Sequence, residues 1–209
     1  MKKVFAGALA TVAVAAAGTS LVAHSGVVDV AADVPHDATL VSLVTWVREQ
    51  SIARRSADIA IPGDLADGER IRRGAGNYAA MCAGCHLAPG VADSELTKGL
   101  NPPPPNLSLA TAAPADGERL PARQFRIVKH GVAATGMPAW GKVGMSDAEV
   151  WDLVAFLQAL PTLDAAGYRQ RVAASDGHSH ADAGQHAAHV DQAAKKAGRE
   201  AHDHAGHAH

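Results

Sequence analysis

Hydrophobic and polar residues divide the chain into stretches, and the first is an almost uncharged apolar run. Lys2 and Lys3 are followed by no charged side chain until Asp29, and the apolar run from Val4 to Ala23 is 20 residues long. A helix of that length spans roughly 30 Å of hydrocarbon at about 1.5 Å per residue. Alanine and small polar residues make the run only weakly hydrophobic, however. Residues 1–28 therefore predict either a cleavable signal peptide or a retained membrane anchor.

Residues 29–62 form a second stretch, which begins irregularly and then becomes helical. Its large apolar residues recur at helical spacing, and charged residues lie on the other faces. We expect a linker that contains an amphipathic helix, with Thr39 as a possible cap and Pro62 as the end. Such a helix would lie on a membrane or pack against the next domain. The apolar positions are Leu40, Val41, Leu43, Val44, Val47 and Ile52.

Residues 63–162 have the pattern of a compact, all-α domain. Asp67 can cap a helix that extends to Met81. Ser146 and Glu149 form a capping box in front of a second apolar helix, which ends at Pro161. Four consecutive prolines at 102–105 and several glycines predict a loop-rich region between the two helices. The alternating pattern of a strand is absent from this sequence.

Residues 163–209 predict a disordered, histidine-rich tail. Almost no large apolar residue follows Val172, so this stretch cannot bury enough surface to fold alone. Neutral imidazoles bind zinc, nickel and copper, and the tail either binds such ions or is a solvated segment without a ligand. The tail histidines are His178, His180, His186, His189, His202, His204, His207 and His209.

Composition and charge narrow the possible functions. The chain has 209 residues with a net charge of -2, which argues against a nucleic-acid partner. Only 4% of the residues are aromatic, so the core is thin and a bound group has to help fill it. The two cysteines are too few for a scaffold of several disulfides, a four-cysteine zinc site or an iron–sulfur cluster.

Both cysteines lie in one pentapeptide, Cys82-Ala83-Gly84-Cys85-His86. This C-x-x-C-H pattern is the one that attaches c-type haem, because two thiols three residues apart on a helical turn can reach both vinyl groups and the next residue can bind the iron. A thioredoxin-like redox pair would need a βαβ context, a zinc site would need two more nearby ligands, and a disulfide would not need His86.

With this motif, residues 67–162 resemble the class I c-type cytochromes. The resemblance implies a small domain of a few helices around one covalent haem, in which the Pro105 carbonyl accepts a hydrogen bond from His86. Gly74 would then let the closing helix approach the first, with Tyr78, Trp151 and Val154 around the crossing. The stretch from Val28 to His36 and the four-proline run also look like membrane-anchored monohaem members, which favours the anchor over the signal peptide.

The sixth iron ligand has three candidates, Met137, Met145 and His130. Met137 lies in the irregular segment Thr135-Gly136-Met137-Pro138, and it matches the axial methionine of the family in position and context. Met145 directly precedes a helix and is expected to pack as an ordinary apolar residue.

The resemblance implies a periplasmic electron carrier that is bound to or released from the outer side of a cytoplasmic membrane. It implies no enzyme, but a carrier that could serve as the cytochrome subunit of a larger oxidoreductase. Its redox partners would be a dehydrogenase, a cytochrome complex or an oxidase. Lys98, Arg123, Arg126 and Lys129 are either positive charge for docking or ordinary solvated surface. The alternatives are a haem enzyme or sensor with a labile sixth ligand, and a metal-handling protein acting through its tail. Without haem, we expect residues 64–162 to be unfolded or molten.

Overall fold

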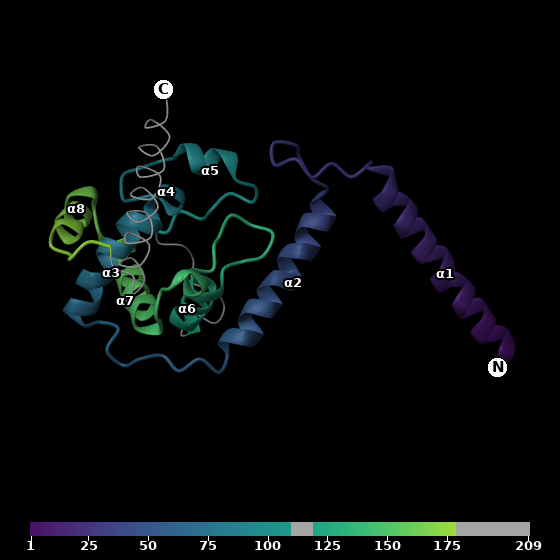
Figure 1. Cartoon of the computed structure of the whole chain (residues 1–209), viewed down its shortest axis with the longest axis horizontal. Coiled ribbons are helices and arrows are strands. Elements are labelled where there is room, and N and C mark those ends of the chain that lie inside the picture. Colours follow the sequence, from purple (N-terminus) through teal and green to yellow (C-terminus); the bar gives the residue numbers. More distant parts are fainter. Residues whose placement is uncertain (110–118, 179–209) are drawn as a thin grey trace, which may run out of the picture. The chain divides into compact units, whose positions relative to one another are not determined.

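The computed structural model describes residues 1–109 and 119–178 (Figure 1). Every regular element within these two ranges is a helix, which confirms the predicted all-α class. The chain divides into two compact units, Met1–Val47 and Arg48–His209. Helix α2 (Ala38–Ser56) begins in the first unit and ends in the second.

The first unit contains the long apolar helix α1 (Lys2–Ser25), and none of the residues of α1 is buried. Among the described residues, α1 is the one helix long and apolar enough to cross a membrane. The next helix, α2, begins after Asp37, whose carboxylate accepts hydrogen bonds of 3.0 Å from the backbone N–H groups of Thr39 and Leu40. The cap is therefore Asp37 and not Thr39, because the aspartate lies outside the helix where its side chain can reach the free N–H groups.

The second unit is built on the crossing of α3 (Gly68–Met81) and α7 (Asp147–Ala159). Both predicted caps are confirmed: Asp67 accepts from the first turn of α3, and Ser146 forms a capping box with Glu149. A Cβ atom at Gly74 would lie 2.1 Å from the main-chain oxygen of Asp152, so only glycine allows the two helices to approach this closely. The predicted role of Gly74 is confirmed.

Shorter helices surround this crossing. They are α4 (Ala83–His86), α5 (Glu95–Gly99), α6 (Leu120–His130), the 3₁₀ helices η2 (Trp140–Val143) and η3 (Leu160–Thr162), and α8 (Ala165–Ala173). Helix α6 packs on α7 through Phe125. Trp151, which we expected beside the α3–α7 crossing, stacks on Phe125 with ring centroids 4.3 Å apart.

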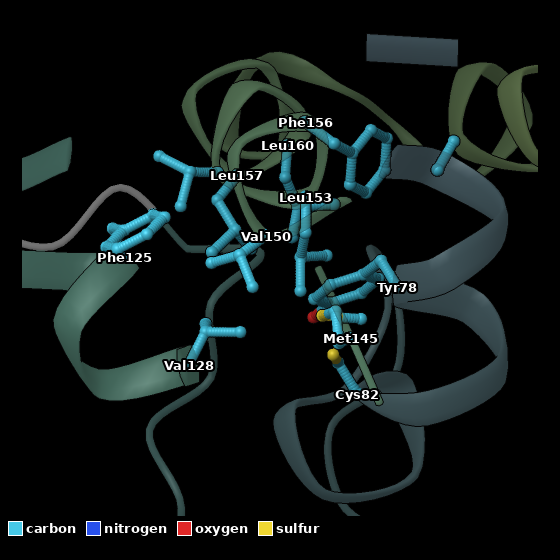
Figure 2. Close-up of a cluster of buried hydrophobic side chains, with 12 residues drawn as sticks. Tyr78, Cys82, Phe125, Val128, Met145, Val150, Leu153, Phe156, Leu157 and Leu160 are labelled. Carbon is cyan, nitrogen blue, oxygen red and sulfur yellow. The ribbon is translucent and has the colours of Figure 1, made fainter. Parts of the chain in front are cut away.

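The buried core reaches the first cysteine. Figure 2 shows Tyr78, Met145 and Cys82 gathered on one side of the cluster, with Phe125 and Val128 on the other. Met145 is 3% exposed and belongs to this core, which confirms that it packs as an ordinary apolar residue. The sulfur of Cys82 is thus held by the same contacts that hold the helices together.

The predicted start of the tail at residue 163 is wrong. Residues 165–173 form α8, and the ring of Tyr168 packs against Tyr78 and Phe156 at centroid distances of 6.2 and 6.3 Å. One tyrosine in a polar stretch is enough to fix a short helix when it enters an existing aromatic cluster. Of the eight tail histidines, His178 is described and is exposed. The other seven lie outside the described residues.

Candidate functional site

The two cysteines and His86 lie on a single helical turn. Helix α3 ends at Met81, and the backbone N–H groups of Cys85 and His86 donate to the carbonyl of Cys82 at 3.1 and 2.7 Å. Residues three apart in such a turn point to the same side. Both thiols are free. The turn therefore presents two thiols and an imidazole together.

The two thiols differ in burial. Cys82 is 6% exposed, and burial raises the pKa of its thiol to about 12. Cys85 is half-buried. Cys82 thus points into the core while Cys85 lies nearer the surface.

His86 is held by the segment that follows the prolines. Its Nδ1 lies 2.9 Å from the carbonyl oxygen of Pro105, and its own carbonyl accepts from the N–H of Leu107 at 3.1 Å. A carbonyl oxygen can only accept, so Nδ1 has the proton and Nε2 keeps its lone pair. This is the contact that the resemblance predicts for Pro105.

Burial also sets the protonation of His86. Loss of hydration lowers the pKa of the imidazole, although the hydrogen bond to Pro105 acts in the opposite direction. The ring is therefore neutral at physiological pH, with Nε2 available, which is the form that binds metal ions.

Tyr78 fixes the backbone beside His86. Its hydroxyl donates to the carbonyl oxygen of Leu87 at 2.5 Å and lies 3.2 Å from that of His86. Leu87 has a φ of 64°, in the region that favours glycine, so the chain is bent sharply just after His86. The sequence indicated Tyr78 only as a packing residue. No pattern in the sequence indicates this second role, because the hydroxyl binds backbone carbonyls beyond the end of its own helix.

Met137 lies in a closed loop after α6. Its N–H donates to the Thr135 hydroxyl at 3.1 Å, its carbonyl accepts from Val132 at 3.2 Å, and Thr135 donates to the Val132 carbonyl at 2.7 Å. The side chain of Met137 is half-buried against the core. A Cβ at Gly136 in the same loop would lie 2.8 Å from a terminal methyl group of Leu100, so the loop packs closely against that side chain. Hydrogen bonds to both the N–H and the carbonyl of Met137 hold the loop in place.

The other two candidates for the sixth ligand, Met145 and His130, are not half-buried as Met137 is. Met145 is in the core, and His130 is exposed at the end of α6. Loss of hydration and the nearby Arg126 and Lys129 lower the pKa of His130.

These residues fit covalent haem c. Two free thiols on one turn, a neutral imidazole with Nε2 available and a half-buried thioether form the donor set that such a group needs. Within residues 1–109 and 119–178, no group of three or more His, Cys, Asp or Glu side chains is arranged to hold a metal ion.

Three of the four cations expected near the site form ion pairs. Lys98 pairs with Asp93 at 3.0 Å and Lys129 with Asp147 at 2.6 Å, both at the surface. Arg123 pairs with Glu49 at 2.6 Å and is largely buried. Arg123 therefore belongs to an interhelix contact and is no docking charge.

Comparison with known proteins places this site in a family. Residues 69–157 match the model of the family described as cytochrome C oxidase, cbb3-type, subunit III. Neither a curated protein nor a solved structure matches the chain. The matched residues extend from the first turn of α3 into the last turn of α7 and contain the Cys82–His86 turn, Pro105 and Met137. Residues 69–157 form a class I c-type cytochrome domain, the kind of domain that carries electrons on covalently bound haem c.

Proposed function

We propose that this chain is a membrane-anchored, monohaem cytochrome c that passes single electrons between redox proteins on the periplasmic side of a membrane. The observation that supports this most strongly is the Cys82–His86 turn, with Nδ1 of His86 bound to Pro105 and Nε2 left for iron. When bound, haem supplies a one-electron iron couple. The chain has only two cysteines, which is enough for one such group.

Each of the site residues has a separate role in holding the haem. Cys82 and Cys85 hold the group through thioether bonds, and Pro105 keeps the His86 ring in one tautomer and one orientation. The hydrogen-bonded loop around Met137 would supply a thioether sulfur as a further ligand for the iron. Ligation by both His86 and Met137 would leave no position on the iron for a substrate, and such a Met/His pair would raise the reduction potential.

Ligation by Met137 is tested by spectroscopy on the full chain. The oxidised protein should show the far-red methionine–iron charge-transfer band, and the reduced protein should not bind carbon monoxide. Met137→Ala should lose the band and gain carbon monoxide binding, whereas Met145→Leu, a control in the core, should change neither. A native protein that binds carbon monoxide would instead support the alternative of a haem enzyme or sensor with a labile ligand.

The location follows from α1. Lys2 and Lys3 precede the apolar helix, and positive residues tend to stay on the cytoplasmic side, so the cytochrome domain would lie on the outer side. Mass spectrometry of the intact mature protein tests in one measurement whether α1 is retained as an anchor and whether haem is attached. We expect residues 1–28 to be retained and the mass of one haem to be added. Loss of residues 1–28 would mean that they are a signal peptide.

The printed description of the matched family suggests a partner. That description is of an oxidase subunit, and we propose that a respiratory oxidase complex accepts electrons from this chain. Membranes that contain such an oxidase should reoxidise the reduced protein, and membranes without it should not. Reoxidation only by dehydrogenase or other cytochrome complexes would name those as the partners.

A second candidate function concerns the histidines at 178–209. Their number supports modest binding of zinc, nickel or copper, which would weaken as the rings protonate below about pH 6. Equilibrium dialysis of a peptide covering residues 173–209 against zinc and copper tests this. Absence of retention at micromolar metal would remove the metal-handling alternative.

A further inference from the structure

Helix α6 presents a row of arginines toward the C-terminal half of α2. Arg119, at the start of α6, donates through Nη2 to three carbonyl oxygens at the end of α2, those of Ser56, Ala57 and Ile59, at 2.8, 2.5 and 2.9 Å. One turn further along, Arg123 pairs with Glu49 of α2 at 2.6 Å. These two arginines satisfy the free carbonyls at the helix end and one carboxylate.

Arg126, the third arginine of the row, binds neither a carbonyl oxygen nor a carboxylate among the described residues. Arg126 is three residues after Arg123 and therefore lies on the same side of α6. It lines a hollow of about 580 Å³ together with side chains of α2 and the residues just after it, Ser51, Arg54, Arg55 and Asp58. Positions 51, 54, 55 and 58 follow the helical spacing that places residues on one face.

The charges in this hollow are unbalanced. Three guanidinium groups against one carboxylate give a net charge of +2. Within the part of the chain that the structure describes, Arg54, Arg55 and Arg126 form no ion pair or hydrogen bond, unlike Arg119 and Arg123 beside them. Like charges at such close quarters repel each other, so a bound anion would stabilise the contact between α2 and α6.

The composition of the hollow favours phosphate over carboxylate. A guanidinium group binds either anion through two parallel hydrogen bonds. A carboxylate has two oxygens and one charge, however, which one arginine satisfies. A phosphate group offers more oxygens and a charge of up to about -2. It can thus engage three arginines and the Ser51 hydroxyl and match the charge.

We propose that the hollow between α2 and α6 binds a phosphate group. The group belongs either to a lipid headgroup that ends in a phosphomonoester, as in phosphatidic acid, or to free phosphate, since both present at least three free phosphoryl oxygens and a charge of up to about -2. This site is separate from the Cys82–His86 turn. Its occupancy does not depend on the oxidation state or the ligands of a haem.

The test measures binding of inorganic phosphate to the full-length protein in a neutral detergent, by calorimetry. We expect saturable binding, about tenfold or more weaker in Arg54→Gln/Arg126→Gln because two charge-assisted contacts are lost. The control Arg169→Gln/Arg171→Gln removes the same charge from two exposed arginines of α8, which have no ion pair or hydrogen bond among the described residues, and should bind as the native protein does. A cooperative thermal transition in each variant establishes that both are folded.

A second measurement distinguishes the sources of phosphate. Short-chain phosphatidic acid that binds more tightly than inorganic phosphate and than short-chain phosphatidylcholine would assign the site to a lipid headgroup. Inorganic phosphate that binds more tightly than either lipid would assign it to free phosphate.

Three results would overturn the proposal. They are the absence of saturable binding of phosphate and phosphatidic acid, an equal loss in the α8 control, and binding of polyglutamate in place of phosphate. The last result would mean that the hollow recognises the carboxylates of an acidic protein. Each measurement reports binding directly, so the outcome is independent of the proposed electron-carrier role.

Discussion

The main-chain oxygen of Asp152 occupies the space that a side chain at Gly74 would need. A Cβ atom there would lie 2.1 Å from this oxygen and 2.8 Å from the Cβ of Phe156. The closest approach of α3 and α7 therefore depends on the absence of one methyl group. This crossing also orients the C-terminal end of α3. The Cys82–His86 turn begins directly after that end.

Gly74→Ala should lower the free energy of unfolding of the second unit by about 3 kcal/mol, because the helices must move apart and lose core contacts. Chemical denaturation of the two proteins measures this. Gly68→Ala is the matched control, since a Cβ at Gly68 in the same helix meets nothing within 4 Å. We expect no loss of stability in the control. Equal stability of Gly74→Ala and the native protein would show that the helices do not pack this closely.

Asp152 also joins the two helices through its side chain. This buried carboxylate accepts from Arg70 at 2.9 Å and from Arg73 at 2.6 and 3.2 Å. Asp152→Asn keeps the shape and removes the charge. It should cost about 2–3 kcal/mol in the free energy of unfolding, because two charge-assisted contacts are lost. Asp93→Asn, which breaks the exposed pair with Lys98, should cost about 0–1 kcal/mol.

The sequence predicted those parts of the fold that depend on local rules. The caps at Asp67 and Ser146 follow from side chains that reach backbone N–H groups a few residues away. The Cys82–His86 motif is equally local, since its five residues specify their own chemistry. The role of Gly74 depends on a distant helix, and it was predicted from the family resemblance.

The parts that the sequence did not predict depend on contacts between distant residues. Tyr168 lies in a polar stretch, and only the aromatic cluster that Tyr78 and Phe156 form shows why α8 packs against the core. The pairing of Arg123 with Glu49 joins residues 74 positions apart, so its charge was mistaken for a surface charge. Periodicity along one helix contains no information about which helix lies opposite.

Tyr78 links this core to the proposed iron ligand. Its hydroxyl donates to the carbonyl of Leu87, directly after His86. Tyr78→Phe should cost about 1–3 kcal/mol, because a buried carbonyl loses its partner. Thermal melting followed at the haem absorption measures this. Tyr168→Phe removes a hydroxyl that has no hydrogen bond among the described residues, and its melting should stay near that of the native protein. Equal melting of both variants with the native protein would mean that this hydrogen bond contributes nothing.

The free thiols report whether the domain folds before haem is attached. In the fold described above, burial raises the pKa of Cys82 to about 12, so at mildly alkaline pH this thiol would stay protonated and react slowly with iodoacetamide, while the half-buried Cys85 would react faster. We expect the haem-free chain to be unfolded or molten, because the ring would supply several hundred Å² of apolar surface to a thin core at roughly 25 cal/mol per Å². Both thiols should then react at the same rate, measured by mass spectrometry of the labelled peptides. Protection of Cys82, together with cooperative melting of Cys82→Ala/Cys85→Ala, would show instead that the helices assemble first and offer a preformed site.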